Sequence, residues 1–214
     1  MFTRLPSRAY AMVCFGLAGV AILGGCSRSE PVPRASLDRR WGTTASPRVV
    51  APGQPIPKGG GIYKVGEPYQ VDGRWHTPQE DPGYDRRGIA SYYADDFHGR
   101  RTANGEVFDM WSLSAAHPTL PLPSLVYVTN LENGRTLLLR VNDRGPYVND
   151  RVIDVSRAAA RYLGFEARGT APVRVRYAGP APLSGDDRYE QRFLASQPWF
   201  RVALSHPPVY SAAR

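Results

Sequence analysis

Residues 142–147 place a carboxylate where a strand is expected to end and a turn to begin. The run at 136–141 is mostly apolar and is typical of a buried strand, and Gly145-Pro146 indicates a turn. A side chain at this junction is held rigidly at the edge of a cleft while its oxygens stay open. Asp143 is therefore the first candidate for a catalytic acid, although it could instead cap the turn or pair with Arg144.

Two further segments carry groups that could assist such an acid. A polar loop at residues 95–106 ends in Glu106, and residues 114–123 place His117 before a proline-rich connection. If Glu106 lies close to Asp143, like-charge repulsion would raise the pKa of one of the two carboxyls. His117 could orient or hydrogen-bond either acid. Equally, Glu106 could be a surface charge beside neighbouring arginines, and His117 could be a structural histidine.

Other polar residues favour structural roles over chemistry. Asp154 stands between apolar residues just before a predicted helix, which favours a structural hydrogen bond. Neither a glycine-rich phosphate loop nor any other cofactor motif occurs, so no cofactor is expected. No metal is expected either, because metal-ligand spacing is absent among the four histidines, His76, His98, His117 and His206.

The elements that must position these groups are short strands and one helix. Asn133-Gly134 predicts a hairpin, and Ser156 and Gly164 are expected to cap a helix between them. Many short strands with a single helix indicate a mainly β domain built as a small barrel. The expected strands are residues 88–93, 124–130, 135–141 and 172–177.

The N-terminus predicts an exported, lipid-anchored protein. Arg4 and Arg8 precede an apolar core at residues 9–23, which has the length of a signal peptide. Gly24 and Gly25 before Cys26 resemble a bacterial lipobox, which implies cleavage before Cys26 and acylation of its thiol. Ser27, in place of the aspartate that favours inner-membrane retention, indicates the periplasmic face of the outer membrane.

The charge of the chain indicates which classes of partner it could bind, and its composition indicates separate parts. The net charge of +8 suits anionic cell-wall polymers or lipid head groups, or it could be solvated charge without a partner. Nucleic acid is not an expected partner, because no recognition motif occurs.

The expected parts of the chain are a signal peptide at 1–25, a proline-rich disordered tether at 26–60, a β extension at 61–87, the barrel at 88–178 and a tail at 179–214.

Seven motifs in the barrel region resemble those of the rare lipoprotein A family. They are Ala90-Ser91-Tyr92-Tyr93, Phe97-His98-Gly99-Arg100, Thr102-Ala103-Asn104-Gly105-Glu106, Ala115-Ala116-His117, Thr119-Leu120-Pro121, Val141-Asn142-Asp143-Arg144-Gly145-Pro146 and Ile153-Asp154-Val155-Ser156. The resemblance implies a six-stranded double-psi β-barrel with one or two short helices. Many relatives carry a C-terminal peptidoglycan-binding domain of the SPOR type, for which residues 179–214 are too few.

The resemblance also implies an activity and its residues. It implies an endolytic peptidoglycan lytic transglycosylase, a lyase that forms 1,6-anhydro-N-acetylmuramic acid ends on glycan strands stripped of stem peptides. Its expected role is cell-wall remodelling or septation, with division proteins as possible partners. Asp143 carries over as the leading acid/base and Glu106 as a second carboxylate, with His117 beside them. Residues expected to line the sugar groove are Tyr93, Thr102, Asn104, Arg140 and Arg144.

Two other functions stay open on the sequence. A lytic transglycosylase needs one acid that later acts as base, because the substrate's own C6 hydroxyl attacks the anomeric carbon. A hydrolase usually needs two carboxylates, which Glu106 and Asp143 could supply. A barrel that keeps the groove without catalysis would be a peptidoglycan-binding or septal scaffold.

Overall fold

A computed structural model describes residues 37–38, 43–44, 46–93, 95–148 and 150–205. The expected signal peptide, Cys26 and the first part of the expected tether lie outside these residues. All of the described residues belong to one compact unit. Among them, no helix is long and apolar enough to cross a membrane.

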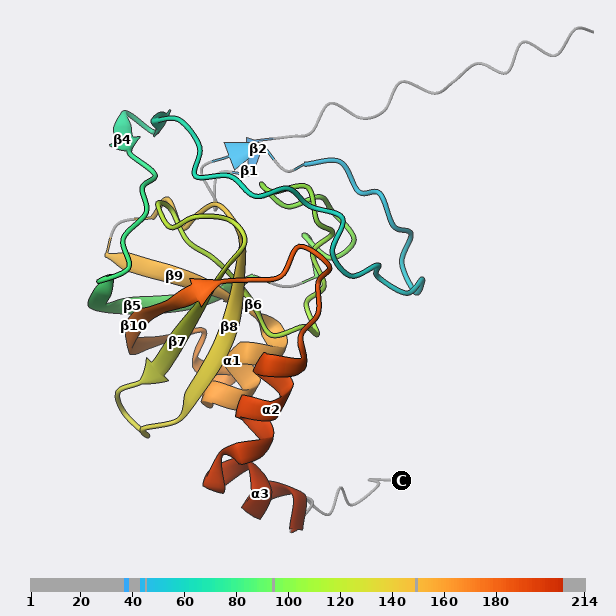
Figure 1. Ribbon diagram of the computed structural model, residues 1–214, viewed down its shortest axis with the longest axis vertical. Helices are drawn as coiled ribbons and strands as arrows, with labels where there is room; N and C mark the ends of the chain where they lie inside the picture. The colour runs from blue at the N-terminus through green and yellow to red at the C-terminus, as the bar shows by residue number, and fades with distance from the viewer. Residues whose placement is uncertain (1–36, 39–42, 45, 94, 149, 206–214) are drawn as a thin grey trace, which may run out of the picture. The chain divides into compact units, whose positions relative to one another are not determined.

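Six strands of the described chain close into a barrel (Figure 1). Around the ring their order is β10, β5, β9, β6, β8, β7, and β7 pairs back onto β10. The pairs β5–β9 and β6–β8 are parallel and the others are antiparallel. The expectation of a mainly β, six-stranded barrel is confirmed. The strands are β5 Asp85–Tyr93, β6 Ser114–Ala116, β7 Ser124–Asn130, β8 Thr136–Asp143, β9 Arg151–Ser156 and β10 Thr170–Pro180.

The local signals for the hairpin and the first helix are confirmed. Gly134 has φ 73° in the turn between β7 and β8, and both strands pair through Thr129 and Thr136. Helix α1, Arg157–Leu163, begins after Ser156, whose side chain accepts a hydrogen bond from the backbone N–H of Ala159. It ends at Gly164, which adopts the left-handed conformation with φ 83°. A 3-10 turn, η1 Glu166–Arg168, leads into β10.

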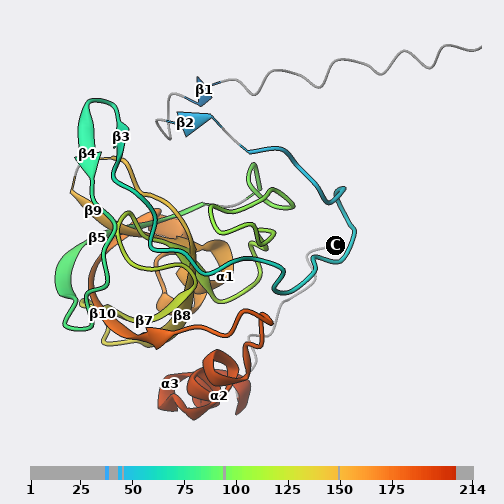
Figure 2. The same cartoon turned by 45° about the horizontal axis from the view of Figure 1, so that its top comes forward.

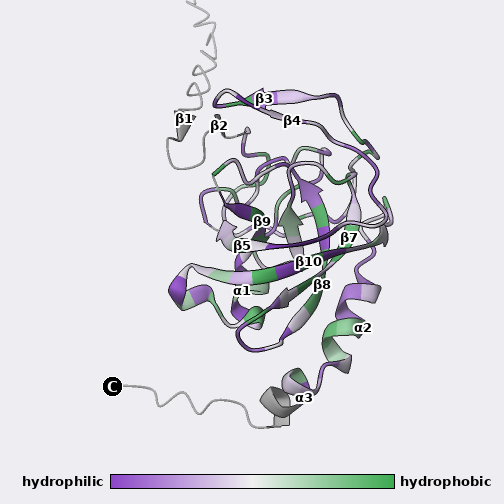
Figure 3. Ribbon diagram, turned by 90° about the vertical axis from the view of Figure 1, so that its left-hand side faces the viewer, coloured by the Kyte–Doolittle hydropathy of each residue, from purple (hydrophilic) through white to green (hydrophobic). Residues whose placement is uncertain are grey.

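The barrel interior forms the main apolar core. Hydrophobic and hydrophilic residues both occur along its strands (Figure 3), and the buried positions are mainly the hydrophobic ones. α1 adds Ala159 and Leu163 to this core. Fully buried strand residues in it include Val126, Val128, Leu137, Leu139, Ile153, Val155, Val173 and Val175.

The C-terminal segment forms two helices that the sequence did not indicate. They are α2 Arg188–Ser196 and α3 Pro198–Ser205, so three short α-helices are described where one or two were expected. α2 lies against β8 (Figure 1). Leu194 of α2 joins the main core, and the ring of Phe193 lies 5.2 Å from that of Tyr127. The pattern was missed because charged residues separate the few apolar positions of α2.

Residues 46–68, which include part of the expected tether, run outside the loops beside the barrel and then across the barrel toward β3 (Figure 2). The backbone N–H groups of Val49 and Val50 donate to Gly99 O at 2.8 and 3.1 Å. Lys58 forms a 2.8 Å ion pair with Asp187. These contacts are mainly polar, so the lack of large apolar residues in this segment did not indicate them. A hairpin follows, β3 Tyr69–Val71 and β4 Arg74–His76, and a short pair, β1 Leu37–Asp38 and β2 Thr43–Thr44, precedes the segment.

Two glycines allow this segment to approach the barrel closely. A Cβ on Gly61 would lie 2.6 Å from Nδ2 of Asn104 and 2.8 Å from Cγ of Glu106. A Cβ on Gly59 would lie 2.5 Å from the carbonyl oxygen of Ser184. Larger residues at either position would push the segment away from the loops that it covers.

We predict that Leu194 stabilises the whole fold. Leu194 is 4% exposed and Leu183 is 48% exposed. Leu194→Ala should lower the free energy of unfolding by about 2–4 kcal/mol through lost burial and a residual cavity. Leu183→Ala should change it by less than about 0.5 kcal/mol. Urea unfolding of the two variants measures the difference, and equal effects would show that α2 is not part of the cooperative core.

Candidate active site

Asp143 is the last residue of β8, as the strand-to-turn junction predicted. Its Oδ1 accepts hydrogen bonds of 2.8 Å from the backbone N–H groups of Ala103 and Arg144. Its Oδ2 forms no hydrogen bond within the described part of the chain. The half-buried carboxyl group lines two cavities, one of about 230 Å³ and one of about 50 Å³. One oxygen is therefore fixed, and the carboxyl group as a whole borders open space.

The environment of Asp143 favours a retained proton. Burial raises the pKa of its carboxyl to about 6, although the two backbone N–H groups and the positive charge of Arg144 act in the opposite direction. Glu106 is not among the causes of this shift. The expected like-charge repulsion between the two carboxyls is therefore not the mechanism, and desolvation takes its place.

Glu106 is buried in a polar network, with 4% of its surface exposed. Arg140 donates to it twice, from Nε to Oε2 at 3.0 Å and from Nη2 to Oε1 at 2.6 Å. The side-chain amides of Asn142 and Asn104 donate to the same two oxygens at 2.9 and 3.0 Å. Burial alone would raise the pKa of Glu106, but these four hydrogen bonds and the Arg140 charge lower it overall. Glu106 is thus held as an anion and cannot readily donate a proton.

The Glu106 network reaches Asp143 through one tight turn. Asn104, held by Glu106, also accepts at Oδ1 from the hydroxyl of Thr102 at 2.9 Å. Ala103, between them, supplies the N–H that holds Asp143. Thr102 and Asn104 are buried, and their side chains serve the turn itself. The geometry therefore gives these two residues and Glu106 positioning contacts, where the resemblance implied contact with sugar or direct catalysis.

The two arginines expected in the groove bind protein groups. Arg144 donates from Nη1 to the carbonyls of Leu120 at 2.6 Å and His117 at 3.2 Å, and from Nη2 to Val65 O at 2.6 Å. Arg140 donates to Glu106 and to Pro182 O. Both guanidinium groups are thus engaged within the fold.

His117 is buried, with 1% of its surface exposed. Its Nδ1 accepts from the backbone N–H groups of Thr119 and Leu120 at 3.2 and 3.0 Å. Nε2 must then carry the proton and donate to the hydroxyl of Tyr84 at 2.8 Å. Burial and Arg144 lower its pKa to about 3, so the ring is neutral. The expected hydrogen bond to Asp143 or Glu106 is absent among the described residues, because both ring nitrogens are used elsewhere.

Asp154 is the carboxylate that shares a cavity with Asp143. It lies in β9 and accepts from Arg151 Nη2 at 3.1 Å. Burial raises its pKa to about 6 as well. We interpreted Asp154 as structural from the sequence. The signal for its burial was its place between two apolar residues, Ile153 and Val155, since an aspartate is rarely buried.

Aromatic side chains form one wall of the Asp143 cavities. The buried ring of Tyr93 stacks on Phe108, with ring centroids 4.2 Å apart, and meets Phe97 edge-on at 5.8 Å. Tyr93 and Phe97 both line the smaller cavity. Tyr93 thus lies at the predicted site as a packed wall residue.

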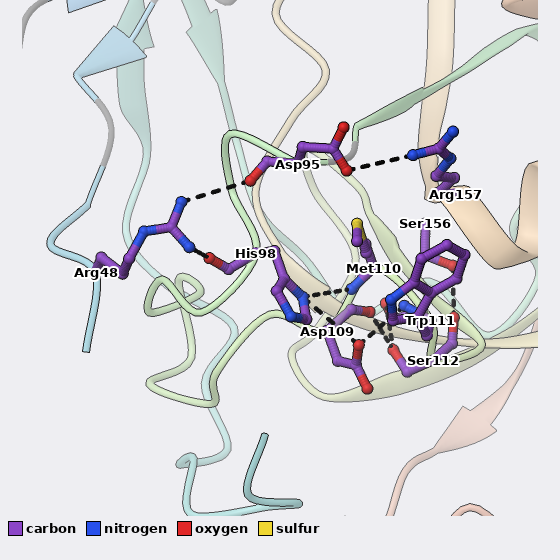
Figure 4. Close-up of polar contacts among 10 residues, drawn as sticks. Arg48, Asp95, His98, Asp109, Met110, Trp111, Ser112, Ser156 and Arg157 are labelled. Atoms are coloured by element: carbon purple, nitrogen blue, oxygen red, sulfur yellow. Dashed lines mark hydrogen bonds and ion pairs between the residues drawn. The ribbon is translucent and has the colours of Figure 1, made fainter. Parts of the chain in front are cut away.

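The loop that carries Phe97 is tied down at both ends (Figure 4). His98 Nδ1 accepts from the backbone N–H of Met110 at 3.3 Å, and Arg48 donates to the backbone carbonyls of His98 and Asp95. Asp95 also forms a 3.3 Å ion pair with Arg157 at the start of α1. Within the described residues, no group of three His, Cys, Asp or Glu side chains could hold a metal ion.

Comparison with known proteins agrees with this fold. A family described as lytic transglycolase (DPBB_1) matches residues 85–175, from β5 into β10. The endolytic peptidoglycan transglycosylase RlpA of Pseudomonas aeruginosa PAO1 is 44% identical over 72% of this chain and 44% of its own length. The protein of the same name from Helicobacter pylori 26695 is 45% identical over 60% of this chain and 41% of its own. The chain therefore spans less than half the length of these two relatives.

Among solved structures, the Streptomyces papain inhibitor (SPI) superposes with a TM-score of 0.39 and 26% identity. That match covers 47% of this chain and 99% of the inhibitor. The family match extends from β5 into β10 and includes Asp143. The barrel at residues 85–175 thus matches the lytic transglycolase (DPBB_1) family, and the resemblance to the rare lipoprotein A family is confirmed.

Proposed function

We propose that this protein is an endolytic peptidoglycan lytic transglycosylase that uses Asp143 as its acid and base. The observation that carries the proposal is the Asp143 carboxyl itself. Its pKa is about 6, one oxygen is fixed by two backbone N–H groups, and the residue lines a cavity. The match of the barrel to the lytic transglycolase family supports the reaction class.

The proposed reaction needs one proton donor and no water. Protonated Asp143 gives its proton to the oxygen that joins N-acetylmuramic acid to N-acetylglucosamine, and the bond from that oxygen to C1 breaks with its electron pair on the oxygen. The C6 hydroxyl of the same muramic residue then attacks C1 and returns its proton to Asp143. The products are a 1,6-anhydro end and a free glucosamine hydroxyl, and the acid is restored.

Asp154 is the second carboxylate suited to this site. Positive charge develops at C1 as the bond breaks, and an ionised carboxylate in the same cavity would stabilise it. Because Asp143 and Asp154 titrate in the same range, one can carry the proton while the other carries the charge. The hydrolase alternative built on Glu106 loses support, since Glu106 is locked to Arg140.

We predict that Asp143→Asn abolishes cleavage while the barrel remains folded. Peptide-free glycan strands should yield anhydro ends with the unaltered protein and none with the variant, as mass spectrometry of the ends measures. Above pH 6 the activity of the unaltered protein should fall about tenfold per unit, because the proton is lost from Asp143.

The same pKa gives a control for folding. Ionised Asp143 is disfavoured in the folded state, so its contribution to stability falls as pH rises from about 4 to about 6. Asp143→Asn should therefore unfold at pH 7 with a free energy no lower than that of the unaltered protein.

The cleavage assay also separates the alternative functions. Reducing ends would identify a hydrolase, and intact strands that still bind would identify a scaffold. Equal anhydro products from both proteins would exclude Asp143 as the acid.

We predict that Glu106 acts through position. Glu106→Gln leaves buried Arg140 without its charge partner and should lower the free energy of unfolding by about 3 kcal/mol. The exposed Glu67→Gln should have no such effect. The activity that remains in Glu106→Gln should fall above pH 6 in the same way as that of the unaltered protein. Disappearance of that pH dependence would make Glu106 the titrating acid.

The site of action is part of the proposal. The lipobox at Cys26 supports an outer-membrane lipoprotein that faces the periplasm, where peptidoglycan is the substrate, with cell-wall remodelling or septation as its role. Division proteins are its proposed partners.

We predict that acylation at Cys26 holds the protein in the membrane. In a Gram-negative host, the full chain should incorporate labelled palmitate and fractionate with the outer membrane, whereas Cys26→Ser should do neither. A labelled Cys26→Ser protein, or an unlabelled full chain, would contradict the anchor.

A further inference from the structure

The larger cavity beside Asp143 has a basic rim that the proposed chemistry does not use. Arg100, Arg101 and Arg144 line this space of about 230 Å³, together with the aromatic rings of Phe97 and Tyr147. Asp143 is the one acidic residue among its described lining residues. Three arginines therefore line the same cavity as a carboxyl that must be protonated to act.

The three arginines differ in how many of their N–H donors are free to bind a ligand. Arg144 is engaged with three backbone carbonyls. Arg100 donates from Nε to Asp96 O at 2.6 Å and from Nη1 to Ser46 O at 2.5 Å. Arg101 is exposed and donates only from Nη1, to Gly105 O at 3.0 Å, within the described part of the chain. Its Nε and Nη2 groups are open, and no described acid pairs with it.

The backbone of Arg101 is held firmly although its side chain is open. Its carbonyl accepts from Ser46 Oγ at 2.5 Å, and its neighbour Thr102 donates from its backbone N–H to Glu106 O at 2.8 Å. Arg101 also forms a β-bridge with Val107. The guanidinium thus starts from a fixed point on the same turn that holds Asp143, which lowers the entropy lost when it binds an anion.

We propose that this cavity is a subsite for a carboxylate-bearing sugar and that Arg101 recognises the carboxylate. The inference rests on the proposed function and specifies its substrate. Muramic acid carries a lactyl group on C3 of the ring whose C1–O bond Asp143 cleaves. Where no stem peptide is attached, that group ends in a free carboxylate, which Arg101 binds with charge-assisted hydrogen bonds. Where a peptide is attached, the same group is a neutral amide, and the attraction is lost.

Binding can be measured apart from cleavage. The full chain carrying Asp143→Asn is titrated with peptide-free glycan strands of one length, with the lactyl carboxylates either free or coupled to methylamine as neutral amides. The free form should bind about tenfold more tightly at low salt, and added salt should reduce the difference. Adding Arg101→Gln should remove the preference for the free form, whereas adding Arg87→Gln, which removes another exposed charge outside the cavity, should keep it.

Each outcome decides the inference. Equal affinity for the two glycan forms, or a preference that survives Arg101→Gln, would overturn the subsite. Arg101→Lys should restore part of the preference, because the charge returns without the planar fork. End analysis with the unaltered chain is read separately. If no anhydro ends appear while the charge preference persists, the proposed reaction fails and the subsite stands.

Discussion

The buried ion pair between Glu106 and Arg140 joins the two parts of the chain from which the site is built. Arg140 belongs to β8, which ends at Asp143, and Glu106 closes the turn that begins at Thr102. Two charges out of water are tolerated here because the fork of Arg140 and two asparagine amides meet both carboxylate oxygens. The pair therefore fixes the distance between a strand end and the N–H group that holds the acid.

This arrangement separates the tasks of the carboxylates. Glu106 is saturated with donors and stays ionised, so it can organise structure but exchanges protons poorly. Asp143 has donors on one oxygen only and is desolvated, so its pKa rises to about 6. The same residue type in β9, Asp154, reaches a similar pKa by burial beside Arg151. Burial and the number of donors, more than proximity between acids, distinguish the three groups.

The features that could be predicted from the sequence are those that depend on residues close together in the chain. The junction at Asp143, the Asn133-Gly134 hairpin and the caps of α1 depend on neighbours in the chain, and all three are found. Glu106 and Arg140 lie far apart in sequence, so nothing in either segment reveals their pairing. Asp154 reaches the cavity only through the parallel pairing of β9 with β5. β6 and β9 were not among the expected strands, and in β6 the residues Ser114, Ala115 and Ala116 have little intrinsic strand preference.

The contact between Val65 and Arg144 bears on what counts as the working unit of this protein. Val65 lies well before the first barrel strand, yet its carbonyl takes one of the three hydrogen bonds that hold the residue next to Asp143. Gly61, on the same stretch, fits against Asn104 and Glu106 only because it lacks a side chain. A barrel transplanted at its family boundaries would carry the acid but lose part of its support. The unit that supports the acid therefore begins before residue 85, with the segment that carries Gly61 and Val65.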